Sequence, residues 1–343
     1  MKMVVRTVTK ARQVKLAVAV LLTVGLTTGC GVGGARDQTG ETTRNQGQVT
    51  SNSAEQGIAN QTGNQAGSLA NRTWGITPSH GGGTLLGIAP PNHVVLVIEE
   101  NHSYQEIAGN KDASYINSLM KQGANLTDYH GVEHPSQPNY LDLFSGSNQG
   151  VTNDSCPHTF STPNLASELN AAKFSFTGYA EDLPNRGYMG CSNGIALISG
   201  TYARKHSPWV NFTNVARDAN QPFSAFPKDY NRLPTVSIVI PNLRHDMHSG
   251  SIKSGDNWLR ANLASYVTWA MQHNSLLIVT FDEDDKSESN RIPTVLVGPM
   301  IKPGNYQQDI NHFSLLRTLE DLYHLPYLGQ SAQASPIGNV WAS

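Results

Sequence analysis

Five continuous apolar runs, each bounded by polar residues, constrain the fold of this chain more than any other feature. Strands that are buried on both faces have such uninterrupted apolar sequences, and they occur mainly in parallel sheets that helices cover. The runs therefore predict buried strands of one sheet. They lie at residues 93–98, 174–179, 235–240, 276–281 and 294–297.

Residues at helical spacing lie between and after these runs. Residues 258–272 place Leu259, Leu263 and Val267 on one stripe, and residues 313–323 contain a similar stripe of leucines. Strands that alternate with helices are typical of α/β proteins. We therefore predict an α/β fold, a three-layer sandwich with a mainly parallel central sheet.

The N-terminus has the features of an export signal. Lys and Arg are frequent in residues 2–15, and the apolar run at 16–26 is too short to span a bilayer. The run leads into Leu-Thr-Thr-Gly-Cys, which is similar to a bacterial lipobox and would make Cys30 the acylated first residue of the mature protein. We predict a signal peptide at 1–29 and a cell-surface lipoprotein; secretion after ordinary cleavage is the alternative.

Residues 30–87 differ in composition from the rest of the chain. Gln, Asn, Gly, Ser and Thr dominate, and apolar residues follow no helical or strand period. Such a segment buries too little apolar surface to offset the entropy of ordering. We predict a disordered tether at 30–87 and a folded domain at 88–343.

Charge and cysteine content narrow the function classes. Only 15% of residues are charged and the formal net charge is -2, so no basic excess points to nucleic acid as a partner. Apart from Cys30, the cysteines are Cys156 and Cys191. Two cysteines in an exported protein commonly form a disulfide, and two buried free thiols are the alternative.

Polar residues follow two of the predicted strands. Glu100 and Asn101 come after the run at 93–98, and Asp282 and Glu283 come after the run at 276–281. Ligands bind at the carboxyl ends of strands in open α/β sheets. Each cluster alone fits a solvated loop, but two clusters of carboxylate and amide oxygens can converge on one divalent cation.

Ser136 lies in the sequence HPSQPNYL, just before an expected helix. Pro138 suits the first turn of that helix, because it lacks an N–H and has a fixed φ. Unpaired N–H groups at a helix N-terminus attract an anion. Ser136 is then either an N-cap or, beside a metal, a nucleophile.

Two histidines lie in loop-like stretches without apolar period, His206 in YARKH and His248 in DMH. Loop histidines are often plain surface residues. Phosphoryl transfer, however, needs positive groups around the transferred oxygens and an acid for the leaving oxygen, and imidazolium supplies both. Cationic histidines would also give an acidic pH optimum.

Six ordered motifs show a family resemblance over about residues 93–341. The chain resembles the phosphoesterase family that contains bacterial acid phosphatases and phospholipases C, a branch of the alkaline-phosphatase-like superfamily. The resemblance implies an alkaline-phosphatase-like core and a catalytic domain at 88–343. The motifs are VIEENHSY, HPSQPNYL, YARKHSPWVNF, PNLRHDMHSGSIKSGDNWL, TFDEDD and NHFSLLRTLEDLY.

The resemblance also implies roles for single residues. Ser136 matches the nucleophile, and Glu100, Asn101, Asp282 and Glu283 match the ligands of one divalent metal ion, Mg, Ca or Mn. Some relatives have Asp where Glu283 stands. His206 and His248 match histidines that line the phosphate pocket in the family. His134 and His312 also lie in family motifs, where their roles are less defined.

These expectations together describe a metal-dependent acid phosphatase. The metal would activate Ser136, a phosphoserine would form and hydrolyse, and His248 or His206 would protonate the leaving alcohol. The substrate would be a small phosphate monoester or a phosphoinositide. The alternatives are a phospholipase C, which cleaves phosphodiesters with the same motifs, and a non-catalytic tethered surface protein.

Overall fold

The computed structural model describes residues 86–194 and 200–342, all of which belong to one compact unit. The predicted signal peptide, Cys30 and nearly all of the predicted tether lie outside the described residues. Within the described part of the chain, no helix has the length and apolar character needed to cross a membrane.

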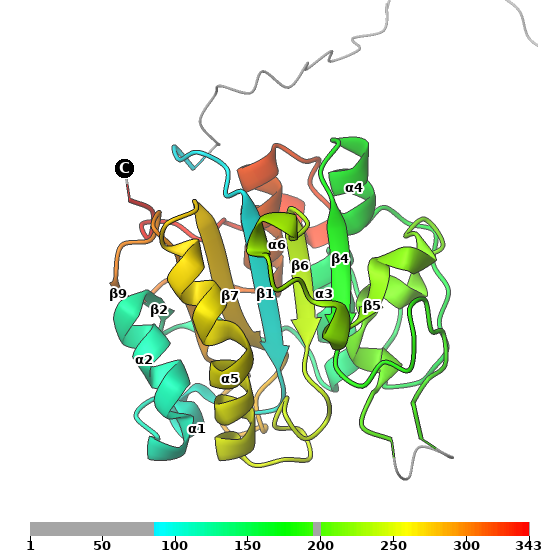
Figure 1. Ribbon diagram of the computed structural model, residues 1–343, viewed down its shortest axis with the longest axis horizontal. Coiled ribbons are helices and arrows are strands. Elements are labelled where there is room, and N and C mark those ends of the chain that lie inside the picture. Colours follow the sequence, from blue (N-terminus) through cyan, green and yellow to red (C-terminus); the bar gives the residue numbers. More distant parts are fainter. Residues whose placement is uncertain (1–85, 195–199, 343) are drawn as a thin grey trace, which may run out of the picture. The chain divides into compact units, whose positions relative to one another are not determined.

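An eight-stranded sheet forms the centre of the described domain, in the order β5-β4-β6-β1-β7-β8-β2-β9 (Figure 1). Strands β5, β4, β6, β1 and β7 run parallel to one another, while β8 is antiparallel to both of its neighbours. Strands β3 and β10 form a separate parallel pair. The strands are β1 His93–Glu99, β2 Ala124–Leu126, β3 Tyr129–His130, β4 Phe176–Ala180, β5 Asn220–Pro222, β6 Val236–Ile240, β7 Ser275–Phe281, β8 Thr294–Val297, β9 Gly304–Tyr306 and β10 Ile310–Asn311.

Each of the five predicted runs contains a strand of this sheet. Strands β6, β7 and β8 are buried along their whole length, and β1 is buried from its second residue onward. Helices cover both faces of these strands, which explains why apolar residues occupy consecutive positions rather than alternate ones. The predicted α/β fold with a mainly parallel sheet is confirmed.

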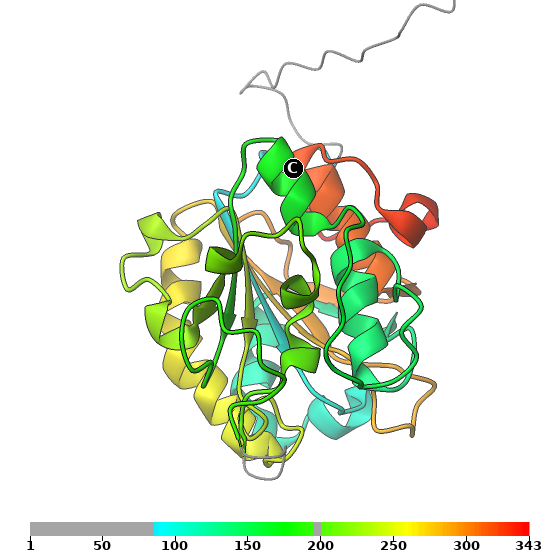
Figure 2. The same ribbon diagram turned by 90° about the vertical axis from the view of Figure 1, so that its right-hand side faces the viewer.

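Two layers of helices flank the sheet (Figure 2). Helices α2 and α5 pack together on one face, and α3, α4 and α6 pack on the other (Figure 1). The α-helices are α1 Tyr104–Ile107, α2 Ser114–Gln122, α3 Ser136–Ser145, α4 Leu165–Ala171, α5 Ile252–Ala270 and α6 His312–Tyr323. The 3-10 helices are η1 Lys111–Ala113, η2 Arg204–His206, η3 Pro208–Asn211, η4 Arg217–Ala219, η5 Phe223–Ala225, η6 Tyr230–Arg232 and η7 Gly329–Gln333.

Helix α3 is the one that places the predicted nucleophile. All ten of its residues are buried, because α3 packs against α6, η2 and η3. A left-handed Gly146 ends the helix, and the Gly146 N–H donates to the Asp142 carbonyl. A helix enclosed in this way has little freedom to move, so it can hold its first residue, Ser136, in a fixed place.

The Asp142 side chain is a buried carboxyl within this helix. Its Oδ2 has no hydrogen-bond partner in the described residues, and burial, with the nearby Glu133 charge, raises the pKa of Asp142 to about 8. The unfolded chain releases this proton near pH 4. Between those pH values only the folded state holds the proton, so stability falls as pH rises through this window.

We therefore expect Asp142→Asn to raise the melting temperature at pH 8 by roughly 3–6 °C, a stabilisation of about 1–2 kcal/mol for a domain of this size. At pH 4, where the wild-type carboxyl is already protonated in the fold, the two proteins should melt alike. Differential scanning calorimetry at both values measures this. An equal shift at both pH values would rule out the titration of Asp142 as the cause.

Candidate active site

The two predicted acidic clusters lie side by side at the carboxyl ends of β1 and β7. The strands are adjacent and parallel, with Glu99 opposite Phe281, and the Asp282 N–H donates to the Glu99 carbonyl at 3.1 Å. Residues that follow these strands must therefore emerge at the same edge of the sheet (Figure 1). The structure brings Glu100 and Asp282 together in this way.

Ser136 points into this acidic cluster from the first residue of α3. Its Oγ lies 3.1 Å from Glu100 Oε2 and 3.2 Å from Glu283 Oε1, and the side chain is 2% exposed. Pro135 occupies the N-cap position of α3. Ser136 is therefore not the N-cap of its helix, which was the alternative to a nucleophile.

The carboxylates around Ser136 have strongly perturbed ionisation. Burial, and then the charges of Glu100 and Glu283, raise the pKa of Asp282 well above its usual value. Burial, and then the charge of Asp246, do the same to the pKa of Glu100. Buried carboxylates that face one another are costly unless a cation accompanies them.

One further observation shows that this cluster fits a metal ion. Asp282 Oδ2 is buried and has no hydrogen-bond partner in the described residues. Oxygens of Glu100 and Glu283 lie within hydrogen-bond distance of the Ser136 hydroxyl, and Asp282 accepts the N–H of Asn101, the residue after Glu100. Hard oxygen donors of this kind suit Mg²⁺, Ca²⁺ or Mn²⁺.

Asn101 joins the ends of the two strands. Its N–H donates to Asp282 Oδ1 at 3.3 Å, and its side-chain Nδ2 donates to Glu283 Oε1 at 2.7 Å. The amide nitrogen thus faces the cluster, and a half-turn of the amide would present its oxygen instead. Asn101 therefore lies where a metal ligand is predicted.

His206, one of the two histidines expected at the phosphate pocket, lies between Glu100 and Asp246. Its ring is 1% exposed, with Nε2 3.0 Å from Glu100 Oε1 and Nδ1 3.4 Å from Asp246 Oδ2. The Nε2 contact has the distance but not the angle of a hydrogen bond. The ring stacks on Tyr140, whose hydroxyl also donates to Glu100 Oε1. Tyr140 thus holds Glu100 by a hydrogen bond, and His206 packs against both residues.

Glu100, His206 and Asp246 form a second possible donor group. One ligand atom from each lies within 4.8 Å of the others, and all three residues are buried. Asp246 Oδ2 has no hydrogen-bond partner in the described residues. The group shares Glu100 with the predicted ligand set, so the two sets lie on opposite sides of one carboxylate.

The other histidines occupy three different positions. His134 contacts Glu283 Oε2 through Nδ1 and lies 3.4 Å from an Asp284 oxygen, so it supports a predicted ligand. His312 Nε2 lies 2.6 Å from the Asp282 carbonyl oxygen, where burial lowers the pKa of His312 to about 4. His248 has an exposed ring 5.9 Å from that of His206. His134 and His248 are both exposed; the His134 ring contacts two carboxylates, whereas the His248 ring contacts the Ser249 hydroxyl and lies beside His206.

The sequence analysis missed two residues of this site. Asp246 contacts His206, and Tyr140 donates to Glu100. Both lie inside quoted motifs, Asp246 two residues before His248 and Tyr140 four residues after Ser136. Both could have been suspected from the sequence, because each is a polar residue inside a motif that carries predicted site residues, and neither had been given a role.

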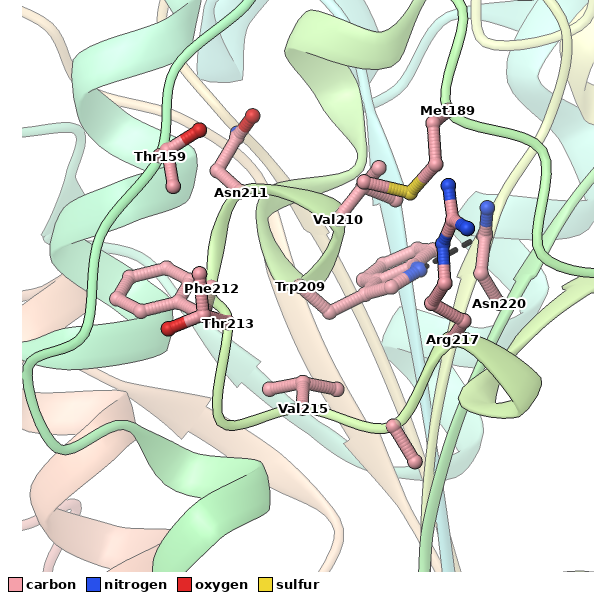
Figure 3. Close-up of a pocket in the computed structure, with 11 residues that line it drawn as sticks. Thr159, Met189, Trp209, Val210, Asn211, Phe212, Thr213, Val215, Arg217 and Asn220 are labelled. Atoms are coloured by element: carbon pink, nitrogen blue, oxygen red, sulfur yellow. Dashed lines mark hydrogen bonds between the residues drawn. The ribbon is translucent and has the colours of Figure 1, made fainter.

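A disulfide joins Cys156 to Cys191, as predicted. A pocket of about 310 Å³ lies elsewhere in the described domain (Figure 3). Its wall is mostly apolar, and Trp209 donates from its ring N–H to Asn220 Oδ1 at 2.9 Å. None of the predicted site residues lines this pocket, and it contains no carboxylate or histidine.

Comparison with known proteins places this site in a family. Residues 110–326 match the Phosphoesterase family. Phosphatidylinositol-3-phosphatase of Mycobacterium tuberculosis is 51% identical over 252 residues, which cover 73% of this chain and 82% of that protein. The resemblance to the phosphoesterase family that the sequence motifs indicated is thereby confirmed. An acid phosphatase of Aspergillus fumigatus is 30% identical, and the match covers 67% of this chain but only 54% of the fungal protein.

Solved structures show likeness at the level of the fold. The lipoteichoic acid synthase LtaP from Listeria monocytogenes aligns with a TM-score of 0.50 and 11% identity, over 71% of this chain and 74% of that one. A protein in the alkaline phosphatase superfamily from Vibrio parahaemolyticus aligns with a TM-score of 0.48 and 11% identity, over 73% and 71%.

Proposed function

This chain belongs to the Phosphoesterase family and is a hydrolase of phosphate esters, and on that premise we propose that it is a metal-dependent acid phosphatase. In this proposal it cleaves phosphate monoesters through a phosphoserine on Ser136. The observation that carries the proposal is the place of the Ser136 hydroxyl, at the start of a buried helix and within hydrogen-bond distance of two carboxylates.

Glu100, Asn101, Asp282 and Glu283 would hold one divalent metal ion. Such an ion supplies positive charge that favours the alkoxide form of a neighbouring hydroxyl. The protein's own contribution is to hold these donors in place. Tyr140 orients Glu100, His206 packs against it, His134 orients Glu283, and His312 contacts the backbone of Asp282.

Ser136 and His248 carry the chemical steps. Ser136 Oγ bonds to phosphorus as the bond from phosphorus to the leaving oxygen breaks, and the serine proton leaves along one of its two hydrogen bonds. His248 donates a proton to the leaving alcohol. Water then attacks phosphorus and gives a proton to His248, the bond from phosphorus to Ser136 Oγ breaks, and the serine proton returns from the carboxylate as inorganic phosphate leaves. His206 is not assigned the acid role, because its ring is 1% exposed.

The proposed substrates are phosphate monoesters, including phosphoinositides, because the relatives are named phosphatidylinositol-3-phosphatase and acid phosphatase. Hydrolysis of three substrates tests it: release of p-nitrophenol from p-nitrophenyl phosphate and from p-nitrophenylphosphorylcholine, and release of inorganic phosphate from phosphatidylinositol 3-phosphate. We expect the first and third to be cleaved, most rapidly at acidic pH, and the second to be cleaved slowly. Preference for the choline diester would establish the phospholipase C alternative.

The role of His248 can be tested through the leaving group. An alkoxide needs a proton as it departs, whereas p-nitrophenolate does not. We expect His248→Asn to slow an alkyl phosphate by about a hundredfold and p-nitrophenyl phosphate by less than about fivefold. His245→Asn is the matched control, because His245 pairs with Glu181 and contacts none of the residues around Ser136. Equal losses on both substrates would show that His248 is not the general acid.

We also propose that the protein is exported and anchored through Cys30. The charged and apolar segments at the N-terminus support this, and so does the disulfide, which forms in oxidising compartments. Labelling cells with a palmitate analogue should mark the wild-type protein and leave a Cys30→Ser variant unmarked. A labelled Cys30→Ser variant, or an unlabelled wild type, would contradict the lipid anchor.

A further inference from the structure

Lys205 lies at the edge of the acidic cluster and has no role in the steps above. Its side chain is 17% exposed, and its Nζ lies 2.7 Å from Asp154 Oδ2. Burial acts to lower the pKa of Lys205, but the carboxylates of Glu100, Asp154 and Asp282 outweigh it and raise that pKa. The ammonium is therefore charged, and it pairs with the Asp154 carboxylate.

Asp154 connects this ammonium to the helix that carries Ser136. While Oδ2 pairs with Lys205, Oδ1 accepts the N–H of Gln137 at 3.0 Å. Gln137 is the residue after Ser136, so this N–H belongs to the first turn of α3. Asp154 thus holds a cation and a helix N–H group next to the hydroxyl.

The chain holds Asp154 and Lys205 together although 51 positions separate them. Cys156, two residues beyond Asp154, forms the disulfide with Cys191. The Cys191 carbonyl in turn accepts the N–H of Arg204 at 3.0 Å, directly before Lys205. The Cys156–Cys191 disulfide, together with this hydrogen bond, therefore links the segment that carries Asp154 to the segment that carries Lys205.

Lys205 is better placed than the neighbouring arginine to meet a substrate. The Arg204 guanidinium is enclosed, and its donors go to Asn211 and to the carbonyls of Met189 and His158. Lys205, by contrast, affects the ionisation of both site histidines, because its charge, after burial, lowers the pKa values of His206 and His248. Its ammonium, paired with the carboxylate that also accepts the Gln137 N–H, is therefore close enough to affect the charge of these histidines.

We propose that Lys205 is a substrate-contacting residue whose ammonium binds the non-bridging oxygens of the phosphoryl group at Ser136, and that Asp154 is the positioning residue that holds it there. This inference rests on the proposed phosphatase function and names the cation that function needs. Charge on the transferred oxygens must be matched by fixed positive groups, and charge-assisted hydrogen bonds to phosphate are strong.

Binding of inorganic phosphate tests the proposal, by calorimetry and as competitive inhibition of p-nitrophenyl phosphate hydrolysis. We expect Lys205→Met to weaken phosphate binding by about tenfold to a hundredfold, with a matching rise in KM. Lys205→Arg keeps the charge and should restore most of the affinity. The exposed Lys228→Met is the control and should bind phosphate as the wild type does.

Asp154→Ala shows whether Asp154 positions the Lys205 ammonium for phosphate or competes with phosphate for it. If Asp154 positions Lys205, its removal weakens phosphate binding by about threefold to tenfold. If Asp154 merely competes with phosphate for the ammonium, its removal strengthens binding and overturns that half of the proposal. Wild-type phosphate affinity in a folded Lys205→Met protein would overturn the other half. A wild-type protein that hydrolyses no phosphate ester would instead refute the proposed function itself.

Discussion

Ser136→Ala is expected to reduce kcat on p-nitrophenyl phosphate by at least about a thousandfold. The substitution removes the oxygen that attacks phosphorus, and no other hydroxyl of the described chain donates to both Glu100 and Glu283. The fold should persist, because a methyl group fills the same buried space and one hydroxyl hydrogen bond contributes only about 1 kcal/mol. Initial rates and melting temperature measure the two effects.

Ser145→Ala provides the matched control. Ser145 is also buried in α3, but its hydroxyl donates to the Leu141 carbonyl at the opposite end of the helix. This variant should turn over at the wild-type rate. Substantial turnover by Ser136→Ala, or an equal loss in Ser145→Ala, would show that the hydroxyl at position 136 is not the nucleophile.

Removal of the divalent ion should abolish turnover and lower the melting temperature. The carboxylates of Glu100, Asp282 and Glu283 face one another in a buried space, so loss of a bound cation leaves their repulsion uncompensated. Readdition of Mg²⁺, Ca²⁺ or Mn²⁺ should restore both properties. The increase in melting temperature with ion concentration gives the dissociation constant, independently of activity.

Two aspartate variants distinguish the possible donor sets. Asp282→Asn should weaken ion binding by at least about a hundredfold, because Asp282 belongs to the predicted ligand set. Asp246→Asn should weaken it by about tenfold, since the Asp246 side chain contacts His206, which in turn lies against Glu100, and is not itself in the predicted ligand set. The reverse order would place the ion among Glu100, His206 and Asp246.

The sheet and the acidic cluster could be predicted because their signals are local. An apolar run followed by Glu100 and another followed by Asp282 each indicate a buried strand with a polar end. Parallel pairing of adjacent strands then brings the two ends to one edge of the sheet. The antiparallel direction of β8 could not be predicted, because its four-residue apolar run has the same pattern in either direction.

The directions of single side chains could not be predicted in this way. The motif that contains His206 indicated a site residue, but not that its ring lies against Glu100 and stacks on Tyr140. The pairing of Asp154 with Lys205 joins a loop to the 3-10 helix η2 and follows no sequence period. Such contacts depend on how loops cross at the sheet edge, which sequence spacing does not encode.

The central claim is that Ser136 carries the phosphoryl group between the two steps of the reaction. Acid quenching of the protein during turnover of p-nitrophenyl phosphate, followed by mass spectrometry of its peptides, tests this most directly. We expect phosphate on Ser136 in the wild-type protein and none in Ser136→Ala. Rapid turnover with no phosphorylated peptide, or with phosphate on another residue, would contradict the account.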